Sequence, residues 1–412
     1  MTPLGWAVPF ALLLLAIAVF PLALPRLWER LWFQAAVAAA CSAPVLVRLL
    51  AHEPATLGAV LHEYGSFILM LGALYVVSSG IVLDGDLRAT PLTNAGILLL
   101  GAALASFIGT TGASMLTIRP LLSTNAERTR SVHSVCFFIL LVSNAGGLLT
   151  PLGDPPLFIG YLRGVPFLWT LRLFPIWVLV VGALLLVYVA VDSWHYRREP
   201  MAARLQDAME REPLRLRGGG NLLLLAAVVA ATALLRSPFR EGAYVSLAAL
   251  SFVVTPRGLR SETRYSWGPI LEVAALFAGI FVAMEPALAI LSERAPTLGV
   301  TEPWQFFWAT GALSSFLDNA PTYAAFLALA QGLGRPEVAG APAEALAAVS
   351  AGAVLFGAMT YIGNGPNFLV RGIAERRGVR MPSFFGYMGF AALVLLPLFG
   401  LVTVLFFRPG SP

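Results

Sequence analysis

Apolar runs of about 20 residues recur along the whole chain and constrain its fold more than any other feature. They lie at about 5–24, 32–51, 65–83, 131–162, 171–191, 220–236, 242–256, 269–291, 344–372 and 384–407. A helix of that length spans the hydrocarbon core of a bilayer. Only 12% of the 412 residues are charged, against about 25% in a soluble domain. These features indicate an all-α polytopic membrane protein, and they exclude a soluble enzyme, a secreted disulfide scaffold and a nucleic-acid binder.

Two further apolar stretches, about 92–122 and 304–331, are too long for one straight span and are interrupted near the middle. The interruptions are residues 109–112 (Gly-Thr-Thr-Gly) and 318–322 (Asp-Asn-Ala-Pro-Thr). This pattern is typical of a re-entrant hairpin, which enters and leaves the membrane on the same side. The alternative is a kinked span, which would reverse the side of every later loop.

The distribution of arginine decides between the hairpin and the kinked span. All 27 basic residues are arginine, and with two hairpins and the amino terminus outside, 19 of them fall in inside loops. A plain span at 92–122 would place the arginine-rich connection 193–218 outside, against the positive-inside rule. We therefore expect two hairpins, both termini outside, and the inner (plasma) membrane of a prokaryote. We expect the first apolar run to be retained as a span, because no basic segment precedes it.

The first half of the chain recurs after this connection. Residues 150–158 (Thr-Pro-Leu-Gly-Asp-Pro-Pro-Leu-Phe) reappear at 360–368 as Thr-Tyr-Ile-Gly-Asn-Gly-Pro-Asn-Phe, and two shorter segments recur in the same order at similar offsets. Each half has five spans, so the second copy is inverted. We predict two inverted repeats of five transmembrane helices, 1–192 and 219–412, joined by a cytoplasmic linker at 193–218. Each repeat has a re-entrant hairpin and a broken helix, which is the architecture of secondary transporters.

The broken helices lie at about 131–162 and 344–372, where glycine and proline interrupt the apolar pattern. Backbone groups freed from a helix in mid-membrane are tolerated where they line a cavity or coordinate a ligand. Two broken helices and two hairpin tips therefore predict a substrate site near the midplane. The alternative is a set of packing kinks that bind nothing.

Acidic residues are rare inside the predicted spans, and an acid in the membrane is a candidate functional group. Asp154 lies in the first broken helix and Asp318 at the second hairpin tip. Each could instead cap the helix that follows it. Glu285 precedes Pro286 near the outer end of its span, and we assign it no role.

The polar residues around these acids offer the oxygen ligands that a hard cation prefers. Our candidate ion-binding residues are Asp154, Asp318, Asn319, Thr322, Thr110, Thr111, Asn144, Thr150, Gly153, Gly363, Asn364 and Asn367. Among them Asp154, Asp318, Asn319 and Asn364 are the candidate ligands of Na⁺. A proton and a cation can compete for one carboxylate, which is sufficient for antiport. We expect transported Na⁺ or Li⁺ and H⁺, and no cofactor.

Three motifs resemble those of the ion transporter superfamily: residues 143–160, 315–322 and 361–367. That superfamily includes NhaD-type sodium/proton antiporters, arsenite pumps and citrate or dicarboxylate transporters. The resemblance covers about 65–407 and implies two inverted repeats, and often a homodimer. Thr110 and Thr111 fall where dicarboxylate carriers keep a Ser-Asn-Thr tip, and Asp318 and Asn319 fall at a tip that is uncharged in those carriers. The chain departs from the carboxylate-carrier pattern in both halves.

We therefore interpret the chain as a secondary transporter, with sodium (or lithium)/proton antiport as the first hypothesis. The alternative is a citrate or other organic-anion transporter coupled to cations, and arsenite efflux is a third. An intramembrane aspartyl protease is disfavoured, because residues before Asp154 read Pro-Leu-Gly instead of Gly-x-Gly. The expected partners are the lipid bilayer, the transported ions and a second copy of the chain, with no nucleic acid.

Overall fold

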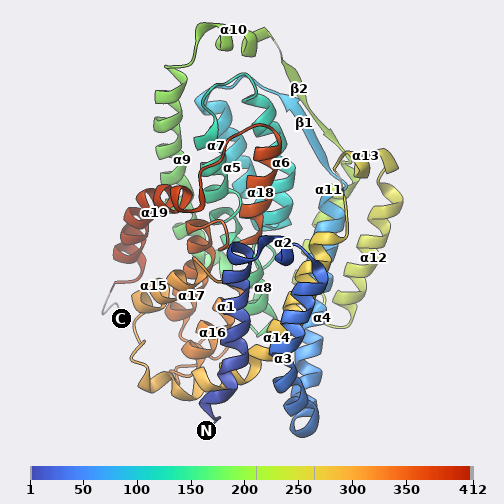
Figure 1. The fold of residues 1–412 in the computed structure, drawn as a ribbon, viewed down its shortest axis with the longest axis vertical. Coiled ribbons are helices and arrows are strands. Elements are labelled where there is room, and N and C mark those ends of the chain that lie inside the picture. The colour runs from blue at the N-terminus through green and yellow to red at the C-terminus, as the bar shows by residue number, and fades with distance from the viewer. Residues whose placement is uncertain (1, 210, 264, 409–412) are drawn as a thin grey trace.

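The computed structural model describes residues 2–209, 211–263 and 265–408, and most of them are helical (Figure 1). The first half, through the central connection, contains η1 (Leu4–Ala7), α1 (Val8–Ala23), α2 (Pro25–Trp28), α3 (Leu31–His52), α4 (Pro54–Ser78), β1 (Val82–Asp86), α5 (Pro91–Ile108), α6 (Thr110–Thr124), α7 (Val132–Leu141), η2 (Ala145–Leu149), α8 (Pro155–Leu162), η3 (Phe167–Leu173), α9 (Phe174–Tyr196), α10 (Met201–Met209) and β2 (Glu212–Arg217).

The second half ends with the same order of helices as α5 to α9, namely two helices that pack together, a broken helix and a long helix. It contains α11 (Gly220–Leu234), α12 (Phe239–Val254), α13 (Arg257–Glu262), α14 (Gly268–Arg294), η4 (Ala295–Thr297), α15 (Pro303–Ser314), α16 (Asn319–Gln331), α17 (Ala343–Phe356), η5 (Gly357–Met359), α18 (Gly365–Arg376) and α19 (Phe384–Phe406).

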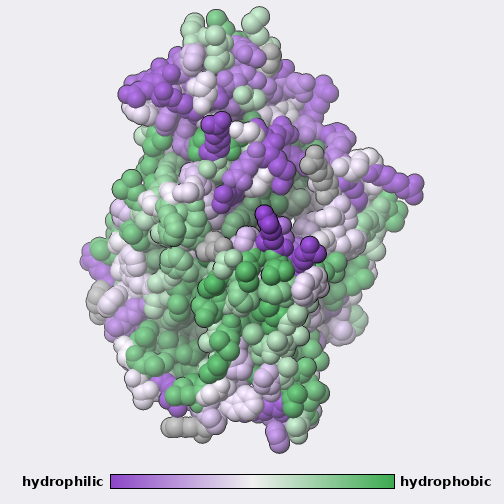
Figure 2. All heavy atoms as spheres, viewed as in Figure 1, coloured by the Kyte–Doolittle hydropathy of each residue, from purple (hydrophilic) through white to green (hydrophobic). Residues whose placement is uncertain are grey.

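The structure is that of a polytopic membrane protein, as the sequence predicts. Within the described residues, eight helices are long and apolar enough to cross a membrane. Apolar side chains cover the lower part of the molecule in Figure 2, and hydrophilic side chains gather at the upper end, where α10 lies. The amino terminus lies at the end opposite α10 (Figure 1).

Helix bounds follow the apolar runs closely, with two differences. The helix α4 begins at Pro54, whereas the apolar run begins near 65. The more polar residues before 65 are still compatible with helix, because tertiary contacts override weak helix propensities. The predicted spans at 220–236 and 242–256 are α11 and α12, which have 15 and 16 residues. Both are shorter than the roughly 20 residues of an ordinary span.

Each predicted hairpin range contains two helices that pack against one another, α5 with α6 and α15 with α16. The first pair is divided at a single residue, Gly109, rather than over 109–112. Gly109 has φ +78°, a value that glycine adopts without the steric cost of a side chain. The re-entry of these pairs on one side of a membrane stays a prediction.

The two broken helices have the same local geometry. Thr150 has φ −137° and ψ 158°, and Thr360 has φ −135° and ψ 167°. A Cβ added to Gly153 or Gly363 would meet the carbonyl oxygen of the glycine six residues earlier. The sequence repeat at an offset of 210 therefore corresponds to a repeat of backbone shape. The upside-down relation of the two halves stays a prediction.

The central connection has structure of its own. Its strand β2 pairs antiparallel with β1, with Val82 opposite Arg217, so a small two-stranded sheet is added to the all-α fold. Arg217 holds this sheet to α13 by an ion pair with Glu262 at 2.6 Å and also pairs with Asp84. The alternation of leucine and arginine in residues 214–217 is a strand signal, but its partner lies far away in the sequence.

Close packing of α3 against α14 gives a first testable prediction. A Cβ added to Gly279 would meet the side chain and backbone of Ala38 at 2.8–3.0 Å. Gly279→Ala should lower the free energy of unfolding by about 1–3 kcal/mol, because overpacking forces the helices apart. Gly72→Ala on α4 meets no atom within 4 Å and is the control. Apparent Tm in detergent measures both, and equal values would contradict the prediction.

Candidate substrate and ion site

Four helices begin at one place in the interior. The helices α6 and α16 begin at Thr110 and Asn319, and α8 and α18 begin directly after Asp154 and Asn364. Side-chain hydrogen bonds join these four residues to one another. The hairpin and the broken helix of each half therefore meet at a single point.

Asp154 is the centre of this cluster and is only 1% exposed. Its Oδ1 accepts hydrogen bonds from Thr110 Oγ1 at 3.0 Å and Asn364 Nδ2 at 3.1 Å, and its Oδ2 accepts one from Asn319 Nδ2 at 2.6 Å. Both carboxylate oxygens thus have donors from other helices. A buried carboxylate requires such partners, and hydrogen bonds to an ionised group are the strong ones.

Asp318 has a different environment. Its side chain caps α16 by accepting from the backbone N–H of Ala320 at 3.0 Å, and the residue lines a cavity. The capping role that the sequence left open is therefore present at Asp318. The Asp154 side chain makes no cap hydrogen bond to α8 and is used for contacts between helices.

The helix ends give this point a positive potential. A helix N-terminus carries the equivalent of about half a positive charge, and four of them meet here. Their dipoles favour an anion, which is the usual use of helix N-termini in binding sites, although proline at the start of α8 removes two backbone donors there. In unwound transporter helices the same geometry binds substrate carboxylates.

A cavity of about 770 Å³, here called the central cavity, opens beside the cluster. Six candidate residues predicted from the sequence line it, namely Thr110, Thr111, Gly153, Asp318, Asn319 and Asn364. Small-molecule sites commonly have volumes of 300–1,000 Å³. The cavity is therefore large enough for a small organic anion together with a coupling ion.

The remaining candidates lie behind the cavity wall and hold the breaks in shape. Asn144 donates to Asn367 Oδ1 at 2.8 Å, and Asn367 donates to the carbonyl oxygens of Gly357 and Thr360. Both asparagines are fully buried. They join the two broken helices to each other. Their role is therefore to position these helices, and they do not line the cavity.

The two hydroxyl candidates, Thr150 and Thr322, bond to backbone. Thr150 donates to the carbonyl of Ser106, and Thr322 donates to the carbonyl of Asp318 at 2.9 Å. Gly363, like Gly153, makes a close backbone approach that a side chain would prevent. These residues shape the interruptions from which the cluster is built.

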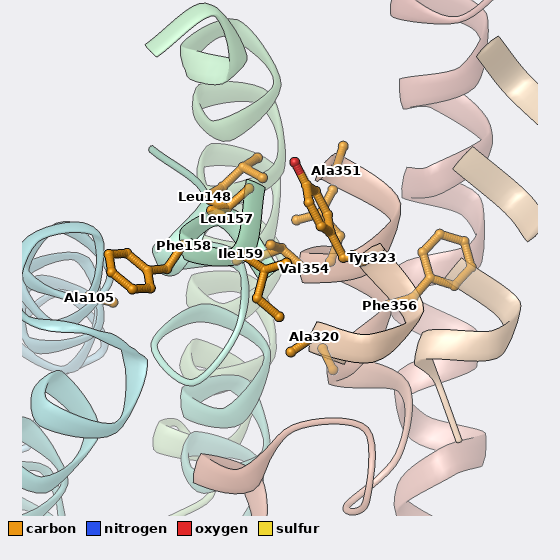
Figure 3. Close-up of a cluster of buried hydrophobic side chains, with 14 of the residues drawn as sticks. Ala105, Leu148, Leu157, Phe158, Ile159, Ala320, Tyr323, Ala351, Val354 and Phe356 are labelled. Atoms are coloured by element: carbon orange, nitrogen blue, oxygen red, sulfur yellow. The ribbon is translucent and has the colours of Figure 1, made fainter. Parts of the chain in front are cut away.

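The packed core beside the cluster fixes the start of α8 against α16. Figure 3 shows Phe158 and Ile159 of α8, Ala320 and Tyr323 of α16 and Val354 of α17 in one group of buried side chains. Interiors of this density transmit small shifts instead of absorbing them. Movement of α8 is therefore coupled to the second hairpin.

Charged residues at the mouth of the central cavity were not predicted. They are Arg119, Glu262, Glu272, Arg376 and Arg377, from α6, α13, α14 and the end of α18. Sequence patterns did not identify them because they belong to four segments that only the fold brings together. Arginines at a cavity mouth raise the local concentration of anions.

Comparison with known proteins assigns the family. Residues 1–407 match a family model described as "Putative citrate transport". The chain belongs to this family. The resemblance of the three motifs to the ion transporter superfamily is thereby confirmed, and the protein is a membrane transporter.

Two relatives of this citrate-transport family member are transporters by name. "Uncharacterized transporter Mb2703" of Mycobacterium bovis and "Uncharacterized transporter Rv2684" of Mycobacterium tuberculosis are each 28% identical to the chain over 332 residues. These alignments cover 74% of this chain and 75% of each relative. The family and the relatives indicate transport rather than catalysis.

The hydrogen bond from Thr110 to Asp154 gives a second prediction. Thr110→Val keeps the side-chain shape and leaves Asp154 Oδ1 with one donor fewer. We expect about tenfold weaker apparent affinity for the coupling ion, since a hydrogen bond to a charged group contributes about 1.5–3 kcal/mol. Thr117→Val on the same helix is the control, because the Thr117 hydroxyl donates to the carbonyl of Ala113 within its own helix. Concentration dependence of transport measures both variants, and equal affinities would contradict the role of Thr110.

Proposed function

We propose that this member of the citrate-transport family carries citrate, or another small organic anion, coupled to protons or cations. The observation that carries the proposal is the meeting of four helix N-termini at the Asp154 cluster, beside the central cavity. That arrangement favours a carboxylate ligand. The family match independently supports an anion of the citrate type.

Asp154 and Asp318 supply the coupling in this proposal. Asp154 is enclosed by donors and holds the four helix starts together, whereas Asp318 faces the central cavity. A proton or cation at Asp318 offsets its repulsion of a substrate carboxylate, because like charges at close range disfavour each other. Binding of the anion and of the coupling ion therefore assist one another.

A substrate panel tests the proposed anion. Proteoliposomes loaded with unlabelled citrate are given external labelled citrate, and exchange is followed with succinate, phosphate, arsenite or chloride as competitors. We expect exchange of citrate, inhibition by related carboxylates and no inhibition by chloride. Exchange that only arsenite supports would overturn the proposal.

Antiport of Na⁺ or Li⁺ against H⁺ is the second candidate. The side chains that contact Asp154 are the hydroxyl of Thr110 and the amides of Asn319 and Asn364, whose oxygens suit a hard cation. A pH gradient across proteoliposomes, challenged with Na⁺, Li⁺ or K⁺ in the absence of citrate, separates the candidates. Collapse by Na⁺ or Li⁺ alone supports antiport, and collapse that requires citrate supports the first proposal.

A further inference from the structure

A second cavity lies at the opposite end of α4 and α8 from the central cavity. It also has about 770 Å³ and is lined by the beginning of α4, the end of α8 and the connection between α11 and α12. The central cavity instead contacts Tyr75 near the end of α4 and Pro155 at the start of α8. Eight residues of α8, at about 1.5 Å each, make the barrier between the cavities about 12 Å thick.

Aromatic rings fill the barrier. Phe67 of α4 stacks on Phe277 of α14 with ring centroids 4.8 Å apart, and it lies 5.5 Å from Phe281 and 6.3 Å from Phe158 of α8. Phe67, Phe158 and Phe281 are fully buried. Rings packed in this way place an apolar layer between the cavities, and we call these four residues the aromatic barrier.

An ion cluster closes the barrier on the side of the second cavity. Arg163, directly after α8, donates to Glu63 of α4 through Nε at 2.8 Å and Nη2 at 3.1 Å, and its Nη2 lies 3.6 Å from Glu285 of α14. The Arg163 and Glu63 side chains are 18% and 16% exposed. This bidentate pairing fixes the orientation of the Arg163 guanidinium relative to the Glu63 carboxylate, as well as their distance. We call these residues the Arg163 cluster.

We propose that the Arg163 cluster is a closed gate, and that the second cavity is the path by which the substrate site reaches the other side of the membrane. A secondary transporter exposes one site to each side in turn, and here the central cavity approaches the site from one side only. Asp154 precedes α8 and Arg163 follows it. The helix therefore joins the coupling carboxylate directly to the gate. Glu285, which had no role in the sequence analysis, is a member of that gate.

The proposed gate predicts from which side of the membrane the substrate site is accessible. If the Arg163 cluster is the closed gate, its interactions are lost on opening, so breaking them should raise the population open to the second cavity. For a partly exposed ion pair we expect about a tenfold rise, equivalent to about 1.4 kcal/mol. The proposal depends on transport and not on which solute is carried.

Thiol labelling measures this population without any substrate. Met115 lines the central cavity, so Met115→Cys in a Cys41→Ser background reports access when a membrane-impermeant maleimide is added from either side. Arg163→Ala and Glu63→Gln should each label about tenfold faster from the second-cavity side. Arg236→Ala is the matched control, because Arg236 also lines the second cavity but is outside the cluster.

The design separates loss of the gate from loss of the fold. Native Cys136 is only 2% exposed and stays unlabelled in a folded protein. The exchanged pair Glu63→Arg with Arg163→Glu, made together with Glu285→Gln so that no second acid faces position 163, should return labelling to the background rate. Background labelling in both folded single variants, or an equal increase in Arg236→Ala, would overturn the proposal. Labelling of Cys136 in Arg163→Ala would show that this variant is misfolded, and the test would then rest on Glu63→Gln. A failure of citrate exchange would leave these readings unaffected.

Discussion

Asp154→Asn is expected to reduce gradient-driven uptake about 100-fold. The carboxylate accepts from Thr110, Asn364 and Asn319, and an asparagine would point an N–H₂ group at donors instead of accepting from them. Loss of these charge-assisted bonds and the resulting donor clash amount to about 2.7 kcal/mol. The substitution also removes the charge on which coupling depends.

The initial rate of labelled citrate uptake into proteoliposomes under an inward proton or cation gradient measures this effect. Asp207→Asn is the matched control. Asp207 is also buried and accepts from the backbone N–H of Ala89 at 2.8 Å, a role that an amide oxygen can keep. Uptake by Asp154→Asn within about twofold of the wild type would show that Asp154 is not the coupling group.

Gly153→Ala is expected to destroy the first break and with it transport. A Cβ at Gly153 would meet the carbonyl oxygen of Gly147, which is backbone and cannot rotate away. We expect about 3 kcal/mol of destabilisation, at the upper end of overpacking costs, because the unwound segment that carries Asp154 must move. Thr110 also loses the acceptor of its backbone N–H, the carbonyl of Gly153 at 2.9 Å.

The control for this glycine is Gly365, at the start of α18. A Cβ there meets no atom within 4 Å, and alanine is favourable at a helical position. Gly365→Ala should therefore retain its apparent Tm, whereas Gly153→Ala should lower its own. Similar behaviour of the two variants would mean that the close approach of residues 147 and 153 does not support the site.

Much of the architecture follows from patterns that are local in the sequence. The apolar runs predict the helices because a span must be apolar along its whole length. The breaks are predictable because glycine, proline and a repeated Thr-x-x-Gly interrupt those runs in both halves. Asp154 and Asp318 are identified because an acid is rare in such surroundings.

The division of roles within the site could not be predicted. Asn144 and Asn367 were chosen for their side-chain oxygens, but the fold uses them to join the two broken helices. Whether an asparagine faces a cavity or a carbonyl depends on which residues the tertiary fold places beside it. The same reason explains why Arg163, Glu63 and the residues at the cavity mouth were missed.

Accumulation of citrate against its own gradient tests the central claim most directly. Wild-type proteoliposomes, with equal citrate on both sides, are given an inward gradient of H⁺, Na⁺ or Mg²⁺, and internal citrate is followed in time. We predict accumulation with at least one of these gradients, and none without a gradient. If citrate never accumulates while Na⁺ or Li⁺ alone dissipates a pH gradient, the site is a cation site and the proposed coupling of an anion to Asp154 and Asp318 is wrong.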